Sequence, residues 1–262
     1  MTTFEERTIL ITGATGGHGR VLAERLASTG ATVLIHGRDE NKGQRIIAEI
    51  SKATGNDRLE WYHADFADIE EVHRMTDEIR DRHTQLHLLI SNAGIGPTTA
   101  SMTFEREMSK QGFELRFAVN YLASFALIRD LYPLLNQTAK FSPTRVINVS
   151  SARQSPIDFA DIMSEERYDA RHAYGQSKLA QIMMTFDLAE RCKDTNVAAV
   201  ALHPSTLEDD VTATLRLVNT VSTAAVNGKY FEIFDETTAH PQAYDPEARS
   251  RLRELSEKLT GE

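Results

Sequence analysis

Two kinds of apolar segment alternate along the chain. The short kind, nearly all apolar, occupies residues 8–12, 32–36, 59–63, 86–91, 145–150 and 197–203. Strands that are buried on both faces of a parallel sheet have this composition. Longer stretches with apolar residues at helical spacing lie between them, such as Val72, Met75 and Ile79 and the run 113–135. The repeated order predicts an α/β fold, in which residues 1–262 form one doubly wound Rossmann-type domain with a mostly parallel sheet.

A further helix is expected near the C-terminus. Asp245 followed by Pro246 is typical of a helix start, because a carboxylate caps free N–H groups and proline is tolerated in the first turn. Apolar residues then share one helix face, at Ala248, Leu252, Leu255 and Leu259. No proline-rich linker or block of charge interrupts the chain, so the pattern predicts no domain boundary.

Charge and cysteine content narrow the function classes. Asp and Glu number 38 and Lys and Arg 29, which gives a formal net charge of −9. Nucleic acid is therefore not an expected partner, since phosphate binding needs an excess of basic residues. No apolar run approaches the ~20 residues of a membrane-spanning helix, so no membrane partner is expected. The single cysteine, Cys192, excludes an internal disulfide and favours a cytoplasmic protein, and the histidines form no zinc-binding pattern.

A glycine-rich turn follows the first predicted strand. It contains Gly13, Gly17 and Gly19 and leads directly into a helix pattern. Glycines allow a sharp turn and a close approach to a pyrophosphate, and a helix N-terminus attracts phosphate. A simple tight turn is the alternative, but the position between a strand and a helix favours dinucleotide binding.

The end of the second strand indicates which dinucleotide is bound. NAD sites usually place an acidic residue here, where this chain has Gly37, and Arg38 follows. A guanidinium suits a 2′-phosphate, so we expect NADP(H) rather than NAD(H). The alternative is that Arg38 is simply solvated and that Asp39 acts as a competing acid.

Tyr174 and Lys178 have the spacing of a proton-transfer pair. Residues four apart on a helix share a face. A tyrosine with a pKa of ~10 is a poor base at neutral pH, but a nearby ammonium stabilises its phenolate. Tyr174 could then act as a general acid or base on an alcohol or carbonyl oxygen. A solvated surface pair is the alternative.

These motifs, in this order, resemble the short-chain dehydrogenase/reductase family. Further matching positions are Asp65 after the third strand, Asn92-Ala93-Gly94 after the fourth, Asn120, Ser150-Ser151 and His203-Pro204. The resemblance implies that Ser151 polarises the substrate oxygen, that Lys178 also binds the nicotinamide ribose, and that Asn120 positions a water in a proton relay. A buried amide satisfied by backbone is the alternative for Asn120. The implied cofactor-binding set is Gly13, Thr15, Gly17, His18, Gly19, Arg38, Asp65, Asn92, Tyr174, Lys178 and Ser205.

Within this family, the chain is most similar to the retinol-dehydrogenase-like branch. The 173–180 segment and the long separation between Ser151 and Tyr174 carry this likeness. The segments 152–172 and 204–228 are expected beside the substrate. His18 replaces the usual Ile or Leu and could contact phosphate or fill space, and Ser205 replaces a glycine. The 204–228 segment is short, so either the lid is truncated or a stretch is absent from this sequence.

The expected function is hydride transfer between nicotinamide and a carbonyl or alcohol substrate that is apolar or polycyclic. One alternative is a regulatory protein that binds NADP(H) and senses redox state without turnover. Another is a dehydratase or epimerase on the same scaffold. The resemblance also implies a homodimer or homotetramer that pairs through the helices at 113–135 and 173–191.

Overall fold

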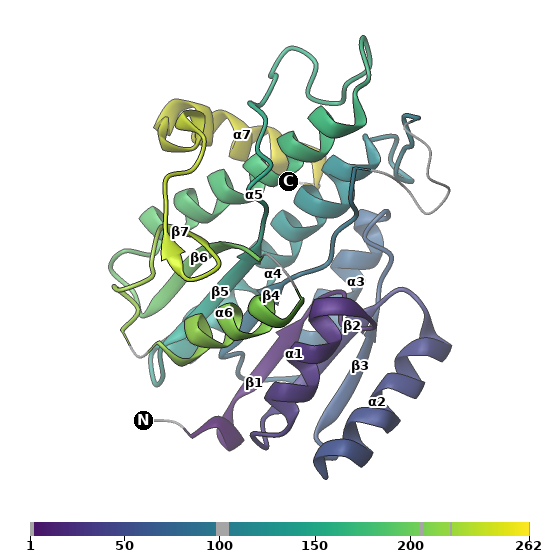
Figure 1. The fold of residues 1–262 in the computed structure, drawn as a ribbon, viewed down its shortest axis with the longest axis vertical. Coiled ribbons are helices and arrows are strands. Elements are labelled where there is room, and N and C mark those ends of the chain that lie inside the picture. Colours follow the sequence, from purple (N-terminus) through teal and green to yellow (C-terminus); the bar gives the residue numbers. More distant parts are fainter. Residues whose placement is uncertain (1–2, 98–104, 205–206, 221, 262) are drawn as a thin grey trace.

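The computed structural model describes residues 3–97, 105–204, 207–220 and 222–261. An eight-stranded sheet forms its centre, with the strand order β3-β2-β1-β4-β5-β6-β7-β8 (Figure 1). Strands β1 to β7 are parallel, and β8 pairs antiparallel to β7. The strands are β1 Thr8–Ile11, β2 Thr32–Gly37, β3 Leu59–His63, β4 Leu88–Ser91, β5 Thr144–Val149, β6 Val197–His203, β7 Lys229–Glu232 and β8 Asp235–Glu236. The predicted α/β fold with a mostly parallel sheet is confirmed.

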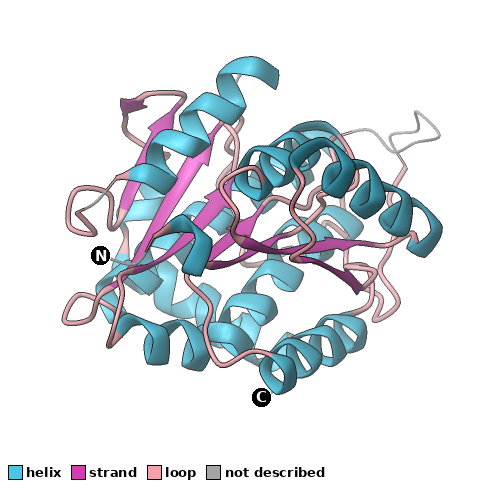
Figure 2. Ribbon diagram, turned by 90° about the horizontal axis from the view of Figure 1, so that it is seen from below, coloured by secondary structure: helices cyan, strands magenta, loops and turns pink. Residues whose placement is uncertain are grey.

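Helices cover both faces of the sheet (Figure 2). They are α1 Gly17–Ala27, α2 Glu40–Thr54, α3 Ile69–Arg82, α4 Ala123–Ala139, α5 Ala170–Arg191, α6 Leu207–Asn219 and α7 Pro246–Leu259. Strand β1 shows how each face receives its core, because side chains alternate along a strand. Leu10 packs with residues of α3, α4, α5 and α7, whereas Ile9 and Ile11 pack with residues of α1, α2 and α6.

Side-chain caps fix where several helices begin. Asp39 starts α2 by accepting a hydrogen bond from the Lys42 N–H, and Asp245 starts α7 by accepting from the N–H groups of Glu247 and Ala248. Proline in the first turn of α7 loses no helical hydrogen bond. The predicted C-terminal helix is therefore confirmed.

The long predicted helix at 113–135 is wrong in its bounds. The structure has a π-helix, η2, over Phe117–Leu122, and α4 continues to Ala139. The extra residue per turn of a π-helix does not change the apolar composition, so the pattern could not show it. Helix α6, Leu207–Asn219, lies within the 204–228 segment that is expected beside the substrate.

The sheet extends beyond the six predicted strands. Two short 3₁₀-helices lie before the first strand and after the last strand in the sequence: η1 Phe4–Glu6 and η3 Pro241–Tyr244. Strand β7 lies beside β6, and β8 forms the edge. The strand order reverses direction between β1 and β4, and ligands in doubly wound sheets bind at the carboxyl ends of the strands beside such a point.

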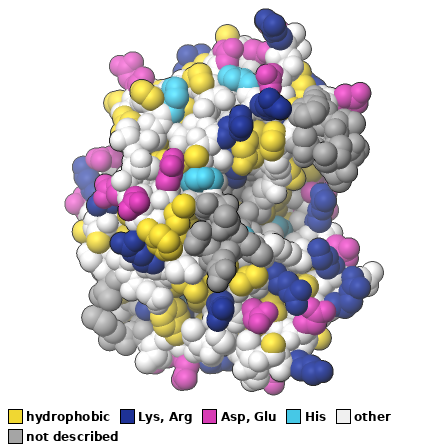
Figure 3. All heavy atoms as spheres, viewed as in Figure 1, with side chains coloured by type: hydrophobic (Ala, Val, Ile, Leu, Met, Phe, Trp, Pro, Cys, Tyr) yellow, Lys and Arg dark blue, Asp and Glu magenta, His cyan; other side chains and the backbone are white. Residues whose placement is uncertain are grey.

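The described helices include none that is both long and apolar enough to cross a bilayer. On the face seen in Figure 3, basic and acidic side chains are interspersed rather than gathered into one basic patch.

Candidate active site

A cleft opens at the carboxyl ends of β1, β2 and β4. Most of the expected cofactor-binding residues line it, namely Gly13, Thr15, His18, Gly19, Arg38, Asp65 and Asn92. Gly17 is the first residue of α1, immediately beside them. Seven of the eleven expected positions therefore line one cavity, and Gly17 adjoins it, whereas Tyr174 and Lys178 are not among its lining residues. Ser205 lies outside the described residues.

The glycine-rich turn leaves no room for side chains on the inner side. Gly13 has φ +65°, and a Cβ there would lie 2.8 Å from the Cα of Ala93. A Cβ on Gly19 would lie 2.6 Å from both the Asn92 Nδ2 and the Gly13 carbonyl oxygen. Asn92 in turn donates to the carbonyl oxygens of Thr12 and Gly13, which ties the end of β4 to the turn after β1. The turn is thus compact enough for backbone N–H groups to line the cleft.

His36 is a cleft residue that the sequence pattern did not single out. It lies in β2 and is buried, its Nδ1 accepts from the Gly13 N–H, and its Nε2 lies 3.0 Å from the Ala64 carbonyl. Burial lowers the pKa of His36 to about 4, so the ring is neutral and donates through Nε2. Its ring stacks on Phe66 at 4.3 Å. A histidine inside an apolar strand resembles an ordinary core residue. No sequence signal could therefore have shown that His36 holds the glycine-rich turn through the Gly13 N–H.

The end of β2 carries a cation at Arg38 and has no space for an acidic side chain at Gly37. A Cβ on Gly37 would lie 2.6 Å from the Thr15 Cγ2 and 2.9 Å from the Trp61 ring. Arg38 is exposed and lines the cleft, and its guanidinium has no carboxylate partner within the described ranges. Asp39 is engaged as the cap of α2. Lys42, one turn later, brings its Nζ to 3.6 Å from the Cβ position of Gly16.

Lys178 is buried at the border of this cleft. Its Nζ donates to the Val149 carbonyl at 3.1 Å and to the Gln181 Oε1 at 2.9 Å. The Nζ lies 5.9 Å from the centre of the Tyr174 ring. It also lies 3.5 Å from the Cβ position of Gly94, a residue of the cleft wall. Burial lowers the pKa of Lys178 to about 8, so the ammonium is mostly charged at neutral pH.

Asn120 lies in the π-helix η2, fully buried. Its Oδ1 accepts from the Ile95 N–H at 2.7 Å, and its Nδ2 donates to the Ile95 carbonyl and to the Ser177 Oγ. These contacts match the alternative of a buried amide satisfied largely by backbone. They also fix Asn120 beside Gly94, whose Cβ position is 3.1 Å from the Oδ1. Single-turn π-helices often occur at functional sites.

Ser151 follows β5 and is buried. Its Oγ accepts from the Arg153 N–H at 3.1 Å, while Ser150 donates to the Lys178 carbonyl and so joins β5 to α5. The Ser151 carbonyl accepts from the Tyr230 hydroxyl at 3.2 Å. Tyr230 belongs to β7, a strand that the sequence pattern did not predict, although the short apolar run after Gly228 was a usable signal.

The comparisons with known proteins agree with this geometry. A family model described as short chain dehydrogenase matches residues 7–220. The chain belongs to the short-chain dehydrogenase family, a family of oxidoreductases.

Curated relatives place this short-chain dehydrogenase in the retinol-dehydrogenase-like branch, as expected. It is 32% identical to retinol dehydrogenase 12 of Homo sapiens, over 97% of this chain and 86% of that protein. It is 35% identical to retinol dehydrogenase 12 of Mus musculus, over 79% of this chain, but that match spans only 63% of the mouse protein.

Solved structures support the fold. An uncharacterized protein from Mycobacterium paratuberculosis has a TM-score of 0.82 at 28% identity, covering 99% of this chain and 95% of the other. A short chain dehydrogenase from Escherichia coli CFT073, complexed with NADPH, has a TM-score of 0.69 at 24% identity, covering 88% of this chain and 97% of the other.

A buried ion pair of this short-chain dehydrogenase holds the 152–172 segment, which is expected beside the substrate. Arg116 is fully buried and lies 3.3 Å from the Glu114 Oε1. Its guanidinium donates to the Tyr168 hydroxyl at 2.6 Å and to the carbonyls of Gly96 and Pro97. The pair thereby joins η2 to the 152–172 segment and to the chain after β4.

The 152–172 segment also packs directly on the first turns of α5. Gln176 donates to the Ile162 carbonyl at 2.9 Å and accepts from the Asp158 N–H at 2.8 Å. A Cβ on Gly175 would lie 2.3 Å from the Ser155 Oγ, so the residue after Tyr174 must be small. The segment therefore lies beside the start of α5, and its expected place beside the substrate stays a prediction.

His18 connects the cofactor cleft to α6. Its Nε2 lies 3.2 Å from the Thr214 Oγ1. Burial lowers the pKa of His18 to about 4, so the ring is neutral at physiological pH. Among the described residues, no group of three His, Cys, Asp or Glu side chains could hold a metal ion.

Proposed function

We propose that the protein is an NADP(H)-dependent reductase or dehydrogenase that transfers hydride between nicotinamide and a carbonyl or alcohol carbon. The observation that carries this proposal is the buried Lys178, whose ammonium lies 5.9 Å from the centre of the Tyr174 ring and 3.5 Å from the Cβ position of Gly94 in the dinucleotide cleft. An isolated buried cation is costly, and a structural role would be served better by an apolar side chain.

The cleft fits a dinucleotide on steric grounds. Gly13 and Gly19 sit where any Cβ would strike neighbouring backbone or Asn92, and the turn leads into the N-terminus of α1. The N–H groups and positive dipole end of α1 attract a pyrophosphate. NADP(H), when bound, supplies the hydride chemistry, and the protein supplies position and electrostatics.

The 2′-phosphate preference rests on the end of β2. Arg38 and Lys42 place cations at the cleft, Gly37 has no room for a carboxylate, and Asp39 is occupied as a helix cap. Arg38 can form two parallel hydrogen bonds to a phosphate. NADPH bound to the similar fold of the Escherichia coli protein agrees with this assignment.

The chain's own residues perform the proton chemistry. In reduction, Tyr174 gives its proton to the substrate oxygen, and the charge of Lys178 stabilises the resulting phenolate. Ser151 donates a hydrogen bond to the same oxygen, which polarises the carbonyl. Asn120 holds Ile95 and Ser177 beside this group. Alcohol oxidation is the reverse of these steps.

The proposed apolar substrate rests on the similarity to proteins named retinol dehydrogenase 12. The 152–172 segment, which is expected beside the substrate, carries the apolar residues Phe159, Ile162 and Met163, which are partly buried against the core. A cytoplasmic location and a homodimer or homotetramer formed through α4 and α5 stay predictions.

Replacement of Tyr174 by Phe tests the proposal. With NADPH and a panel of apolar aldehydes and ketones, we expect the rate of NADPH oxidation to fall about 10²–10⁴-fold. NADPH affinity should be retained, because only a hydroxyl is removed. Tyr132→Phe on α4 is the matched control and should leave the rate unchanged. Equal rates for Tyr174→Phe and the native protein would refute the assignment, and cofactor binding without any turnover would favour a redox sensor.

A further inference from the structure

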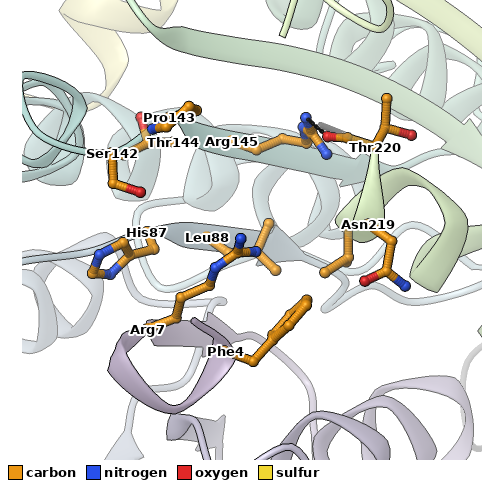
Figure 4. Close-up of a pocket in the computed structure, with 11 residues that line it drawn as sticks. Phe4, Arg7, His87, Leu88, Ser142, Pro143, Thr144, Arg145, Asn219 and Thr220 are labelled. Carbon is orange, nitrogen blue, oxygen red and sulfur yellow. Dashed lines mark hydrogen bonds between the residues drawn. The ribbon is translucent and has the colours of Figure 1, made fainter. Parts of the chain in front are cut away.

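A second cavity lies at the opposite end of the sheet from the active site, at the amino ends of β4 and β5. Figure 4 shows this cavity and the residues that line it: Phe4, Arg7, His87, Leu88, Ser142, Pro143, Thr144, Arg145, Val218, Asn219 and Thr220. Strand β5 separates it from Ser151. Since a strand rises about 3.3 Å per residue, the two sites are roughly 20 Å apart.

The lining of this cavity is basic. It includes two arginines and a histidine, and the described residues that line it contain no Asp or Glu. Arg7 reaches the cavity from the segment after η1, and Arg145 reaches it from β5 (Figure 4). The Arg7 guanidinium lies 4.2 Å from the centre of the Phe4 ring and has no carboxylate partner among the residues described.

Arg145 is almost fully buried, with an exposed fraction of 7%. Its terminal nitrogens donate to the carbonyl oxygens of Leu217 and Thr220 at the end of α6. Its Nε is buried and has no hydrogen-bond partner. A buried donor without an acceptor is costly, because it loses its hydration without compensation.

The electrostatics agree with an unsatisfied basic site. Burial, together with the charge of Arg7, lowers the pKa of Arg145 to about 10. Burial and Arg7 also lower the pKa of His87, while Glu6 raises it. His87 is held by the Thr8 N–H, which donates to its Nδ1 at 3.1 Å. The two guanidinium groups therefore repel each other, and an anion between them would relieve this repulsion.

We propose that this cavity is a binding site for a small organic carboxylate that carries a short apolar chain. The carboxylate would accept a hydrogen bond from the Arg145 Nε and would neutralise Arg7. Its apolar chain would lie against Phe4, Leu88 and Val218, which line the same cavity. The apolar wall favours a carboxylate with a chain over inorganic phosphate. This site is independent of the function proposed above.

Titration calorimetry with hexanoate tests the site, with hexanamide as the neutral probe of the same shape. We expect hexanoate to bind with one-to-one stoichiometry and hexanamide to bind at least about ten-fold more weakly. Arg7→Gln should weaken hexanoate binding roughly ten-fold, and Arg7→Lys should retain most of the affinity. Arg7→Met, which keeps the apolar stem of the side chain, remains informative if Arg7→Gln is unstable. Thr144→Val should bind hexanoate as the native protein does, because the Thr144 side chain faces the other side of the sheet from Arg145.

Arg38→Gln in the dinucleotide cleft is the matched control and should bind hexanoate as the native protein does. Equal binding of hexanoate and hexanamide would overturn the proposal. So would an unchanged affinity in both Arg7→Gln and Arg7→Met, a loss of binding in Arg38→Gln or Thr144→Val, or binding of inorganic phosphate without binding of hexanoate.

Discussion

The dinucleotide half of the site and the half that we propose for the substrate, here called the substrate half, are built in different ways. The dinucleotide half consists mainly of backbone, with glycines where a Cβ would collide and helix α1 beginning at Gly17. The substrate half depends on side-chain networks that join distant segments, such as Arg116 with Glu114 and Tyr168. A backbone site requires particular residue types at fixed spacing, whereas a side-chain network can be made in many ways. Sequence patterns can therefore reveal a site built from backbone, but not a network of side chains.

The largest expected effect is on the stability of the substrate half. Arg116→Met leaves the buried Glu114 carboxylate without its cation and should cost about 3–5 kcal/mol of unfolding free energy. Urea unfolding measures this loss. Arg74→Met is the control, since Arg74 forms an exposed pair with Glu71 and should change stability by less than about 1 kcal/mol. If Arg116→Met were as mild as Arg74→Met, the substrate half would not depend on this pair.

A smaller effect is expected in the dinucleotide half, where a substitution should lower the affinity for NADPH as well as the stability. Gly19→Ala forces a Cβ against Asn92 and the Gly13 carbonyl. The turn must shift, and we expect NADPH affinity to fall about ten- to hundred-fold, or about 1.4–2.7 kcal/mol. Gly16→Ala is the matched control, because its Cβ would meet only the flexible end of Lys42. Equal affinities for the two variants, measured by fluorescence titration, would contradict the steric account of the turn.

The smallest stability effect is expected at Lys178, where the halves meet. A depressed pKa means that the unfolded chain holds more protons than the folded one between pH ~8 and ~10.5, so native stability rises with pH over this window. Lys178→Met removes this dependence. The lowered pKa corresponds to about 3 kcal/mol of destabilisation of the native protein at neutral pH, which Lys178→Met removes. The variant also loses the hydrogen bonds to Val149 and Gln181, and this loss lowers its stability by about 1–2 kcal/mol.

Lys178→Met should therefore be about 1–2 kcal/mol more stable than the native protein at pH 7, while it loses turnover. Denaturant unfolding from pH 7 to 10.5 measures the first property and NADPH oxidation the second. A stability curve whose pH dependence matches that of the native protein would show that Lys178 does not titrate as described.

Sequence patterns predicted the fold class, the first six strands and the family. They succeeded because buried parallel strands are continuous apolar runs and because the glycine-rich turn and the Tyr174–Lys178 spacing are local signals. They missed β7, β8 and the π-helix around Asn120, since short edge strands and one-residue expansions leave the apolar pattern nearly unchanged. The roles of His36 and Tyr230 could not be predicted, because each depends on a partner far away in the chain.

The central claim is that hydride passes between nicotinamide and the substrate carbon. Reduction of an apolar ketone with each stereoisomer of NADPH deuterated at C4 tests it most directly, with mass spectrometry of the product. We expect one stereoisomer to give an alcohol with a single deuterium on the former carbonyl carbon, and the other to give none. A product without deuterium from either stereoisomer, or cofactor binding without any product, would contradict the account.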